Sequence, residues 1–405
     1  MKHLKTVFNT LFGLLLLLFS GAYTPVYAQE STVEDILPDP MDSVEVALLT
    51  CQPHDEIYSL YGHTAIRYHD MRKDKEVDVA FNYGVFDFKK PYFVLRFVFG
   101  LTDYELGVYP FSLFLKEYRH FGSMVTEQVL NLTSEEKLLL HEALRQNLQP
   151  GNSVYRYNYF YNNCTTKARD IIEKCITGKT EYAERENFTP TYREMVHEMT
   201  RNHPWARFGN DLLLGIKADQ PTTLRQQEFL PYNLMYDFDH AQIYENGQYR
   251  PLVKERRTAL PGGVQIVKQG FPLSPIACAI LLTVTGLILL ILQWRSKRSF
   301  LFWDILLMLT IGTIGIMLTL MLFSQHPTVS LNLQILLFNP LPWFFLWSVI
   351  RGRQNRYWLV SCVLIALFFI GSLFQQYAEG LWSLALCLLM QCYIHINKCR
   401  CSNRN

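Results

Sequence analysis

The chain has 405 residues, of which 49% are hydrophobic and only 18% are charged, and the charges are unevenly distributed. From Phe271 to the C-terminus there are nine Lys and Arg residues and two acidic residues, whereas the preceding part carries 29 basic and 34 acidic residues. A water-soluble first part is therefore followed by a basic, apolar second part, which excludes an ordinary soluble globule, a disordered protein and, without a Lys/Arg-rich stripe, a nucleic-acid-binding protein.

Residues 1–28 have the pattern of a secretory signal peptide. Lys2 and Lys5 precede an apolar run at residues 11–19, and a small-residue cleavage site ends at Ala28. The run is short for a membrane-spanning helix, which needs about 20 residues, so a cleaved signal is favoured over an uncleaved anchor. We therefore expect the mature protein to be exported.

The exported part, residues 29–262, is expected to form an α+β domain. Alternation of apolar and polar residues predicts strands, and the spacing of Thr133 and Glu136 is that of a capping box, which predicts a helix. Asn246-Gly247 predicts the turn of a β-hairpin. An apolar run at 44–49 is followed by expected strands at 61–68, 77–88 and 155–161, and the expected helices are 133–148 and a segment that starts at Cys164.

Two residues of this domain have the context of a nucleophile and its base. His63 lies at the start of a predicted strand, and Cys164 lies in an Asn-Asn-Cys-Thr-Thr segment between a predicted strand and a predicted helix. A thiolate at a helix N-terminus is stabilised by the helix dipole and the free N–H groups, and a neighbouring imidazole stabilises it further. The pattern predicts a catalytic Cys–His pair. The alternative is that both are ordinary core residues, as an isolated Cys or His usually is.

A third residue, Asn82, is predicted to orient the imidazole. The turn between the first two alternating strands would place Asn82 within a residue or two of the position opposite His63. Asn82 belongs to a strand face with small side chains, against which the helix of Cys164 is expected to pack. Holding the imidazole is the role of the third member of such triads, and Asp87 is the rival candidate for it.

The remaining residues of the exported domain offer few further candidates. Tyr61 and Arg67 lie on the same strand as His63 and are candidates for substrate contact, although Arg67 equally suits a structural salt bridge. A disulfide between Cys51 and Cys175 stays open. No cofactor and no metal are expected, because the remaining histidines show no metal-ligand spacing.

The second part of the chain contains five apolar segments of the length that crosses a membrane, which is about 20 residues. They are expected to follow a linker at residues 263–273 and to form a five-helix transmembrane domain at 274–397, with a tail at 398–405. The expected spans are 274–294, 300–323, 331–350, 357–375 and 380–396.

The connecting segments predict the orientation of these spans. Connectors 295–298 and 351–356 and the tail are basic, whereas connectors 324–330 and 376–379 contain no Lys or Arg. Basic connectors favour the cytoplasmic face. We therefore expect a multi-pass protein of the bacterial inner membrane, with the exported domain in the periplasm and the C-terminus in the cytoplasm.

Polar residues interrupt the membrane part near its outer side. His326 follows the second span, and Asn332 and Asn339 lie within the third. Polar groups at membrane depth are functional candidates, and a polar groove there would hold a lipid head group, so these three residues are candidates for substrate binding. The alternative is a proline kink at Pro340 whose freed carbonyl groups are satisfied by Asn side chains.

Five stretches of the sequence together resemble one known family, the lipoprotein N-acyltransferases of the Lnb type. They are Tyr-Gly-His-Thr-Ala-Ile-Arg at 61–67, Phe-Asn-Tyr-Gly at 81–84, Asn-Asn-Cys-Thr-Thr-Lys-Ala-Arg-Asp at 162–170, His-Pro-Thr-Val at 326–329 and Leu-Leu-Phe-Asn-Pro at 336–340. The resemblance implies a permuted papain-like domain, related in layout to NlpC/P60 proteins. It also implies that His63 and Cys164 are the catalytic pair.

The implied reaction moves a fatty acyl chain from a membrane phospholipid to the N-terminal amine of a diacylglyceryl-cysteine lipoprotein, through a thioester on Cys164. The implied partners are the phospholipid donor, the diacylated lipoprotein acceptor and the membrane. Two alternatives remain open. One is a membrane-tethered cysteine amidase or peptidase that acts on cell-wall peptides, and the other is a membrane scaffold without enzymatic activity.

Overall fold

The structure of the protein is a computed structural model that describes residues 41–72, 76–86, 91–186, 188–267, 270–296, 300–352 and 356–402. The expected signal peptide at residues 1–28 lies outside the described residues. Asp87, the rival of Asn82, also lies outside them.

The N-terminal part is built on a seven-stranded antiparallel sheet with the strand order β10-β5-β1-β2-β3-β4-β6. The strands are β1 Val44–Cys51, β2 His63–Asp70, β3 Val77–Val85, β4 Asp103–Pro110, β5 Val125–Leu130, β6 Val154–Arg156 and β10 Val253–Leu260. The strands predicted at 61–68 and 77–88 correspond to β2 and β3, and the apolar run at 44–49 lies in β1. Strand β1 is buried along almost its whole length, which is why its sequence is a continuous apolar run and does not alternate.

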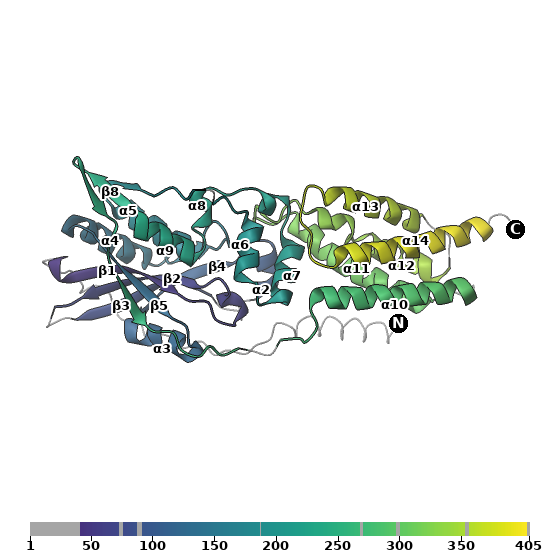
Figure 1. Cartoon of the computed structure of the whole chain (residues 1–405), viewed down its shortest axis with the longest axis horizontal. Coiled ribbons are helices and arrows are strands. Elements are labelled where there is room, and N and C mark those ends of the chain that lie inside the picture. The colour runs from purple at the N-terminus through teal and green to yellow at the C-terminus, as the bar shows by residue number, and fades with distance from the viewer. Residues whose placement is uncertain are drawn as a thin grey trace. The chain divides into compact units, whose positions relative to one another are not determined.

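Helices cover both faces of this sheet (Figure 1). On one face, Ile172 of α5 packs in a core with Ile66 and Phe81 of β2 and β3. On the other face, α3 packs its aromatic side chains, among them Phe114, against Ala65. The helices of the first face are α4 Ser134–Asn147, α5 Cys164–Cys175 and α9 Pro231–His240, and the helix of the second face is α3 Phe111–Phe121.

The prediction that the helix of Cys164 packs on the small face of β3 is wrong. That face, with Ala80, is covered by α3, whose bulky Phe114 and Tyr118 fill the space above small residues. The body of α5 lies instead on the face of the large side chains, Phe81 and Tyr83. Aromatic side chains pack well over small ones because the combined volume fills the layer.

Two local predictions for the remainder of this part are confirmed and one is wrong. Helix α4 begins with the predicted capping box of Thr133 and Glu136. The predicted hairpin joins β8 (Gln242–Glu245) to β9 (Gln248–Pro251). The strand expected at 155–161 ends at Arg156 in β6, because the chain then turns back on itself in a bridge of Asn158 with Asn162.

Further short elements complete the N-terminal part. They are η2 Met41–Ser43, η3 Ile57–Ser59, α2 Phe93–Val98, β7 Lys179–Glu181, α6 Tyr192–Met199, α7 Pro204–Leu213, η4 Ile216–Asp219 and α8 Leu224–Gln227. Strand β7 pairs with β8 in a second, three-stranded sheet. The fully buried Arg193 of α6 forms ion pairs with Asp211 at 2.8 Å and Asp219 at 2.6 Å, which holds α7 and η4 to α6.

The C-terminal part is helical, and its helices follow the predicted apolar segments (Figure 1). They are α10 Pro275–Ser296, α11 Leu301–Met321, η5 Leu333–Leu336, α12 Leu341–Ile350, α13 Tyr357–Gly371 and α14 Leu381–Ser402. Among the described residues, three segments are long and apolar enough to cross a membrane: α10, α11 and residues 333–350. The apolar parts of α13 and α14 are shorter.

The third of these segments is not one continuous helix. It divides into η5 and α12 around Asn339-Pro340. Proline has no N–H to donate and clashes with the preceding turn, so a helix cannot run through it undisturbed. Gly315 of α11 lies directly against the backbone of Asn339, where any larger residue would collide with the break.

Candidate active site

Cys164 is the first residue of α5, and Asn163 fixes the geometry of that helix start. The Asn163 side-chain oxygen accepts hydrogen bonds from the N–H groups of Thr165 at 3.0 Å and Thr166 at 2.9 Å. Its side-chain nitrogen donates to the carbonyl oxygens of Tyr159 at 3.0 Å and Phe229 at 2.9 Å. Asn163 therefore connects the start of α5 to the preceding loop at Tyr159 and to Phe229, and it holds Cys164 in one position.

Cys164 and His63 meet where strands β2 and β3 separate. The pairing of these strands ends at Ile66 and Phe81, and β3 is irregular between Tyr83 and Val85. Gly84 lies in this irregular segment with φ +125°, a conformation that residues with a side chain rarely adopt.

Gly84 lies between the two reactive side chains. A Cβ atom on Gly84 would be 3.6 Å from Cε1 of His63 and 3.7 Å from Cβ of Cys164. Helix α5 lies on the Thr64 side of β2, since the hydroxyl oxygens of Thr64 and Thr165 are 3.1 Å apart. Neighbouring residues of a strand point to opposite faces, so His63 reaches the opening from the other side of the sheet.

Asn82 contacts the imidazole, as expected from its predicted position within a residue or two of the one opposite His63. The distance between His63 Nε2 and Asn82 Oδ1 is 2.7 Å. Because a carbonyl oxygen only accepts, Nε2 carries the hydrogen, and Nδ1 is the nitrogen left for the thiol of Cys164. The structure therefore brings together His63, Asn82 and Cys164, three residues that are far apart in the sequence.

The electrostatic environment favours an ionised pair. Burial opposes ionisation of Cys164, but the charge of His63 and hydrogen bonds from His63, the Thr64 backbone and the Thr165 hydroxyl outweigh it and lower the pKa of the thiol to about 7. Burial likewise opposes the charge on His63, yet the charge of Cys164 and hydrogen bonds with Cys164 and Asn82 raise the imidazole pKa. A thiolate and an imidazolium are therefore accessible together near neutral pH.

The start of α5 offers one backbone donor to a ligand. Asn163 accepts from the N–H groups of Thr165 and Thr166, whereas the N–H of Cys164, at the first position of the helix, has no acceptor among the described residues. An N–H at this place can hold the oxyanion that forms when a thiolate attacks a carbonyl carbon. The neighbouring N–H groups of Thr165 and Thr166 are not available, because they donate to the Asn163 side chain.

Tyrosines that the sequence did not assign to the site surround Cys164. Burial and the charge of Cys164 both raise the pKa of Tyr104, Tyr155 and Tyr157. The ring of Tyr104 stacks on Tyr157 with centroids 4.0 Å apart and on Phe86 at 4.8 Å. The site thus has an aromatic wall suited to an apolar substrate. In the sequence, the one indication of this wall was that Tyr155 and Tyr157 lie within ten residues of Cys164.

Two family models match the chain on either side of a gap. One, the Lnb N-terminal periplasmic domain, matches residues 39–198, and the other, the Lnb transmembrane domain, matches residues 266–401. The chain belongs to the Lnb family. Neither a search of curated proteins nor a search of solved structures gave a match.

Membership of this family makes the N-terminal part of the chain a periplasmic domain and the C-terminal part a membrane region. The protein is therefore a membrane protein of the bacterial envelope. Both His63 and Cys164 fall within the match to the periplasmic domain. Residues 199–265, which include α7, lie outside both matches.

Arg67 is engaged by two carboxylates in this Lnb-family protein. Its guanidinium donates to both oxygens of Asp78 at 2.8 Å and to Glu127 at 2.8 Å. It also lies 3.9 Å from the centre of the Phe111 ring of α3. Tyr61 packs edge-on against Tyr159 with centroids 5.0 Å apart. These contacts give Arg67 the geometry of a structural salt bridge and Tyr61 that of a packing residue beside the loop before α5.

Asn332 belongs to a group of buried amides that we call the outer amide cluster, formed by Asn332, Gln334 and Gln375. The side chain of Asn332 donates to Leu212 O at 2.8 Å and accepts from Gln375 at 2.9 Å. Gln334 donates to Asp211 O at 2.8 Å, and all three amides are almost fully buried. The cluster joins the C-terminal helical part to α7, and the Asn332 amide is fully used in hydrogen bonds to protein groups.

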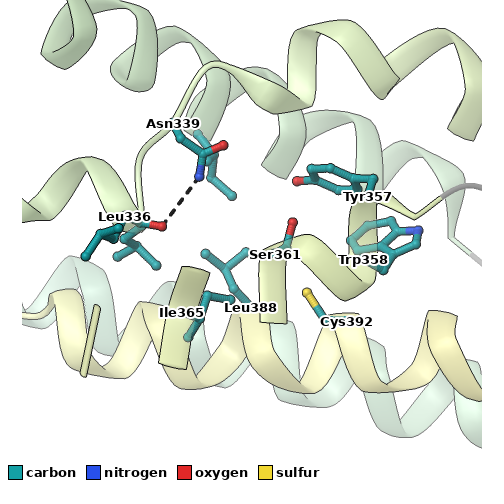
Figure 2. A pocket seen from close by; sticks show the side chains of 10 residues that line it. Leu336, Asn339, Tyr357, Trp358, Ser361, Ile365, Leu388 and Cys392 are labelled. Carbon is teal, nitrogen blue, oxygen red and sulfur yellow. Dashed lines mark hydrogen bonds between the residues drawn. The ribbon is translucent and has the colours of Figure 1, made fainter. Parts of the chain in front are cut away.

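Asn339 lies at the break between η5 and α12. Its side chain donates to Leu336 O at 3.5 Å and accepts from the N–H of Leu341 at 3.3 Å, which are the contacts expected of a residue that caps a proline break. Figure 2 shows that Asn339, Tyr357 and Ser361 line a small cavity between the helices. The volume of this cavity is ≈ 20 Å³, room for about one water molecule and too small for a lipid head group.

His326 contacts the periplasmic domain. Its ring centre lies 6.0 Å from that of Phe97, and the neighbouring Gln325 donates its N–H to Phe99 O at 3.0 Å. Burial lowers the pKa of His326, and a hydrogen bond with the Phe97 backbone offsets part of this shift. Among the described residues, none of the contacts of His326, Asn332 or Asn339 involves Cys164.

The structure contains no disulfide between Cys51 and Cys175, the pairing that the sequence left open. Cys51 and Cys175 are both buried and unpaired. Cys51 lies opposite His63 in the pairing of β1 with β2, whereas Cys175 ends α5 in the core on the other face of the sheet. In the described ranges, no group of three or more His, Cys, Asp and Glu residues is placed to hold a metal ion.

Proposed function

We propose that this protein is a lipoprotein N-acyltransferase, which moves a fatty acyl chain from a membrane phospholipid to the N-terminal amine of a diacylglyceryl-cysteine lipoprotein. The observation that carries the proposal is the Cys164 thiol, with a pKa of about 7, beside a His63 held by Asn82 in a member of the Lnb family. The order of these residues on a helix and two strands agrees with a permuted papain-like domain, the fold we propose for this part.

In the first half of the reaction, the Cys164 thiolate attacks the ester carbonyl carbon of the phospholipid. The N–H of Cys164 stabilises the negative charge on the carbonyl oxygen. The ester C–O bond then breaks, and the imidazolium of His63 gives its Nδ1 proton to the departing lysophospholipid oxygen. The products are a thioester on Cys164 and a neutral His63.

In the second half, the α-amine of the lipoprotein attacks the thioester. His63 Nδ1 takes the proton of the amine, the C–S bond breaks, and the thiolate of Cys164 returns beside the imidazolium. The new amide bond stays on the lipoprotein. Asn82 keeps the imidazole in one orientation through both proton transfers. A thioester reacts more readily with amines than with water, which favours transfer over hydrolysis.

The membrane part serves the same reaction, because both substrates reside in a bilayer. We propose that all five apolar segments cross the inner membrane. The basic connectors and the tail favour a C-terminus in the cytoplasm, with the periplasmic domain beside the outer leaflet. The domain is thereby kept at the surface in which phospholipids and lipoproteins diffuse.

Replacement of the nucleophile tests the proposal. The variant Cys164→Ala, expressed as the only copy, should leave lipoproteins with a free N-terminal amine, which mass spectrometry of their N-terminal peptides detects as the loss of one acyl chain. Cys175→Ala is the matched control, because Cys175 ends the same helix, is buried and has a pKa raised by burial. That control should retain N-acylation.

The alternatives give different results in the same experiment. If Cys164→Ala leaves N-acylation intact and instead abolishes cleavage of cell-wall peptides, the protein is a cysteine amidase or peptidase. If neither activity changes, Cys164 is a core residue of a scaffold. Either outcome contradicts the transferase proposal.

A further inference from the structure

Helix α2 exposes apolar side chains on the surface of the periplasmic domain. Tyr92, directly before the helix, is 79% exposed, and Leu95 and Phe97 are 47% and 37% exposed. The one charged residue of the helix, Arg96, is paired with Asp103 at 2.7 Å and also donates to Leu101 O at 3.2 Å. A short helix with exposed aromatic and aliphatic residues and a neutralised charge is typical of a surface that lies in a membrane interface.

The end of α2 is fixed to the loop that leaves the membrane. Helix α11 ends at Met321, and four residues later the N–H of Gln325 donates to Phe99 O at 3.0 Å. Gly100, with φ +69°, allows this approach, because a Cβ there would lie 3.1 Å from Cβ of Gln325 and 3.3 Å from Cδ2 of His326. Since α11 has the length and composition of a membrane span, α2 lies where that span emerges from the bilayer.

Apolar side chains are exposed both at the end of the span and on α2. Leu322 and Phe323, between the end of α11 and the Gln325 contact, are 38% and 73% exposed. Their position directly after a membrane span identifies lipid as the occupant, because the same bilayer that surrounds α11 reaches its last residues. A protein partner would have to compete with lipid for the same surface.

We propose that Tyr92, Leu95 and Phe97 insert into the lipid leaflet on the periplasmic side, so that α2 is an interfacial anchor in addition to the membrane helices. The ligand class is the acyl-chain and head-group region of a phospholipid bilayer. Aromatic residues favour this region because one end of the ring system is apolar and the other can remain hydrated.

The anchor also lies next to the candidate active site. Arg96 binds Asp103, the first residue of β4, and the following Tyr104 stacks on Tyr157 in the aromatic wall near Cys164. Insertion of α2 would therefore hold the entrance of the site at the depth of the phospholipid ester groups. This step rests on the proposed function, whereas the insertion itself does not.

Depth-dependent quenching tests the insertion. An environment-sensitive fluorescent amino acid is incorporated at Leu95 of the full-length protein, and the protein is reconstituted in vesicles of phosphatidylethanolamine and phosphatidylglycerol. The same amino acid at Leu138 of α4, which is 48% exposed, provides the matched control. Lipids with brominated acyl chains should quench emission at Leu95 several-fold more than at Leu138, and aqueous iodide should show the opposite order.

Two results would overturn the proposal. Equal quenching by brominated lipids at both positions means that α2 lies in water. Protection of Leu95 from both quenchers means that protein covers it. Neither readout depends on catalysis, so a failure of the transferase proposal does not affect them.

A charge on α2 tests the link to the site. The double variant Leu95→Asp/Phe97→Asp should slow N-acylation in vesicles several-fold, while Leu138→Asp should have no effect. The rate at which iodoacetamide alkylates Cys164 should be the same in all three proteins, which shows that the site itself is intact. An unchanged rate of N-acylation in the double variant, with quenching as expected, would remove the link and keep the anchor.

Discussion

The Cys164 site and the outer amide cluster both depend on side-chain amides, and they differ in what the amides hold. In the site, Asn163 and Asn82 use their hydrogen bonds to fix the start of α5 and the imidazole of His63. The thiol and the N–H of Cys164 stay available to a substrate. In the cluster, Asn332, Gln334 and Gln375 bind one another and the backbone of α7. Saturated amides of this kind hold parts of a protein together without leaving a reactive group.

This contrast predicts two classes of variants. Changes at the site should alter reactivity and leave stability nearly unchanged, since His63 and Cys164 are only partly buried. Changes in the cluster should lower stability and leave the chemistry of Cys164 unchanged. A variant that breaks this division would show that the two regions are coupled.

The largest effect is expected from His63→Ala. Removal of the general base should reduce the rate of N-acylation by about 10²- to 10⁴-fold. In the native protein, alkylation of Cys164 should increase with pH around 7, because its pKa is lowered to about 7 and the thiolate is the reactive form. Without the charge of His63, this inflection should move to higher pH. Iodoacetamide kinetics followed by mass spectrometry measure the shift.

The matched control for this variant is His69→Ala. His69 lies on the same strand, and its ring faces Glu76 at 3.5 Å instead of Cys164. It should retain both the acylation rate and the pH profile. An unchanged alkylation profile in His63→Ala would contradict the assignment of His63 as the partner of the thiol.

The second largest effect is expected from Asn82→Ala. The imidazole would lose its acceptor at 2.7 Å and rotate more freely, which should lower the acylation rate by about 10- to 100-fold. Because the hydrogen bond with Asn82 also helps to raise the pKa of His63, the pKa of the imidazole should fall. Nuclear magnetic resonance of labelled His63 measures it. A full acylation rate would remove Asn82 from the mechanism and return Asp87 to consideration.

The sequence predicted those features whose signals are local. Strands β2 and β3 follow alternation, helix α4 follows the Thr133 capping box, and the closeness of Asn82 to His63 follows from the turn between two strands. Each of these depends on residues within about twenty positions of one another, where periodicity and turn chemistry act directly. The Cys–His pair needed one long-range assumption, that α5 returns to β2.

The features that sequence reasoning missed depend on long-range packing. Nothing in the alternation of β3 tells which face α5 covers, and that choice depends on how well the aromatic side chains of α3 fit over Ala65 and Ala80. The outer amide cluster joins residues separated by more than one hundred positions, such as Gln334 and Asp211. Asn332 and Asn339 were therefore candidates for substrate binding in the sequence, whereas their contacts in the structure are hydrogen bonds to protein groups.

A moderate effect on stability is expected from Gln334→Ala. The variant removes one of the hydrogen bonds to the Asp211 carbonyl and leaves the buried N–H of Ala378 without its acceptor, which costs about 1–3 kcal/mol. The midpoint of thermal unfolding in detergent micelles should fall, and the alkylation profile of Cys164 should stay the same. Gln376→Ala, one residue after Gln375 and exposed, is the control and should unfold at the native temperature. A shifted alkylation profile in Gln334→Ala would show that the cluster positions the site.

The smallest effect is expected from Thr165→Val, which tests how finely the thiol is tuned. The Thr165 hydroxyl lies 3.8 Å from Cys164 Sγ and 3.1 Å from the hydroxyl of Thr64, so it can pass a hydrogen bond from Thr64 to the sulfur. Valine keeps the shape and removes the donor. The pKa of Cys164 should rise slightly, because Thr165 contributes least of the three groups that stabilise the thiolate, after His63 and the Thr64 backbone. Thr165→Ser should restore the native alkylation profile. If valine instead lowers the unfolding midpoint and leaves the profile unchanged, Thr165 is a structural residue like those of the outer amide cluster, and the tuning of Cys164 depends on His63 and the backbone of Thr64.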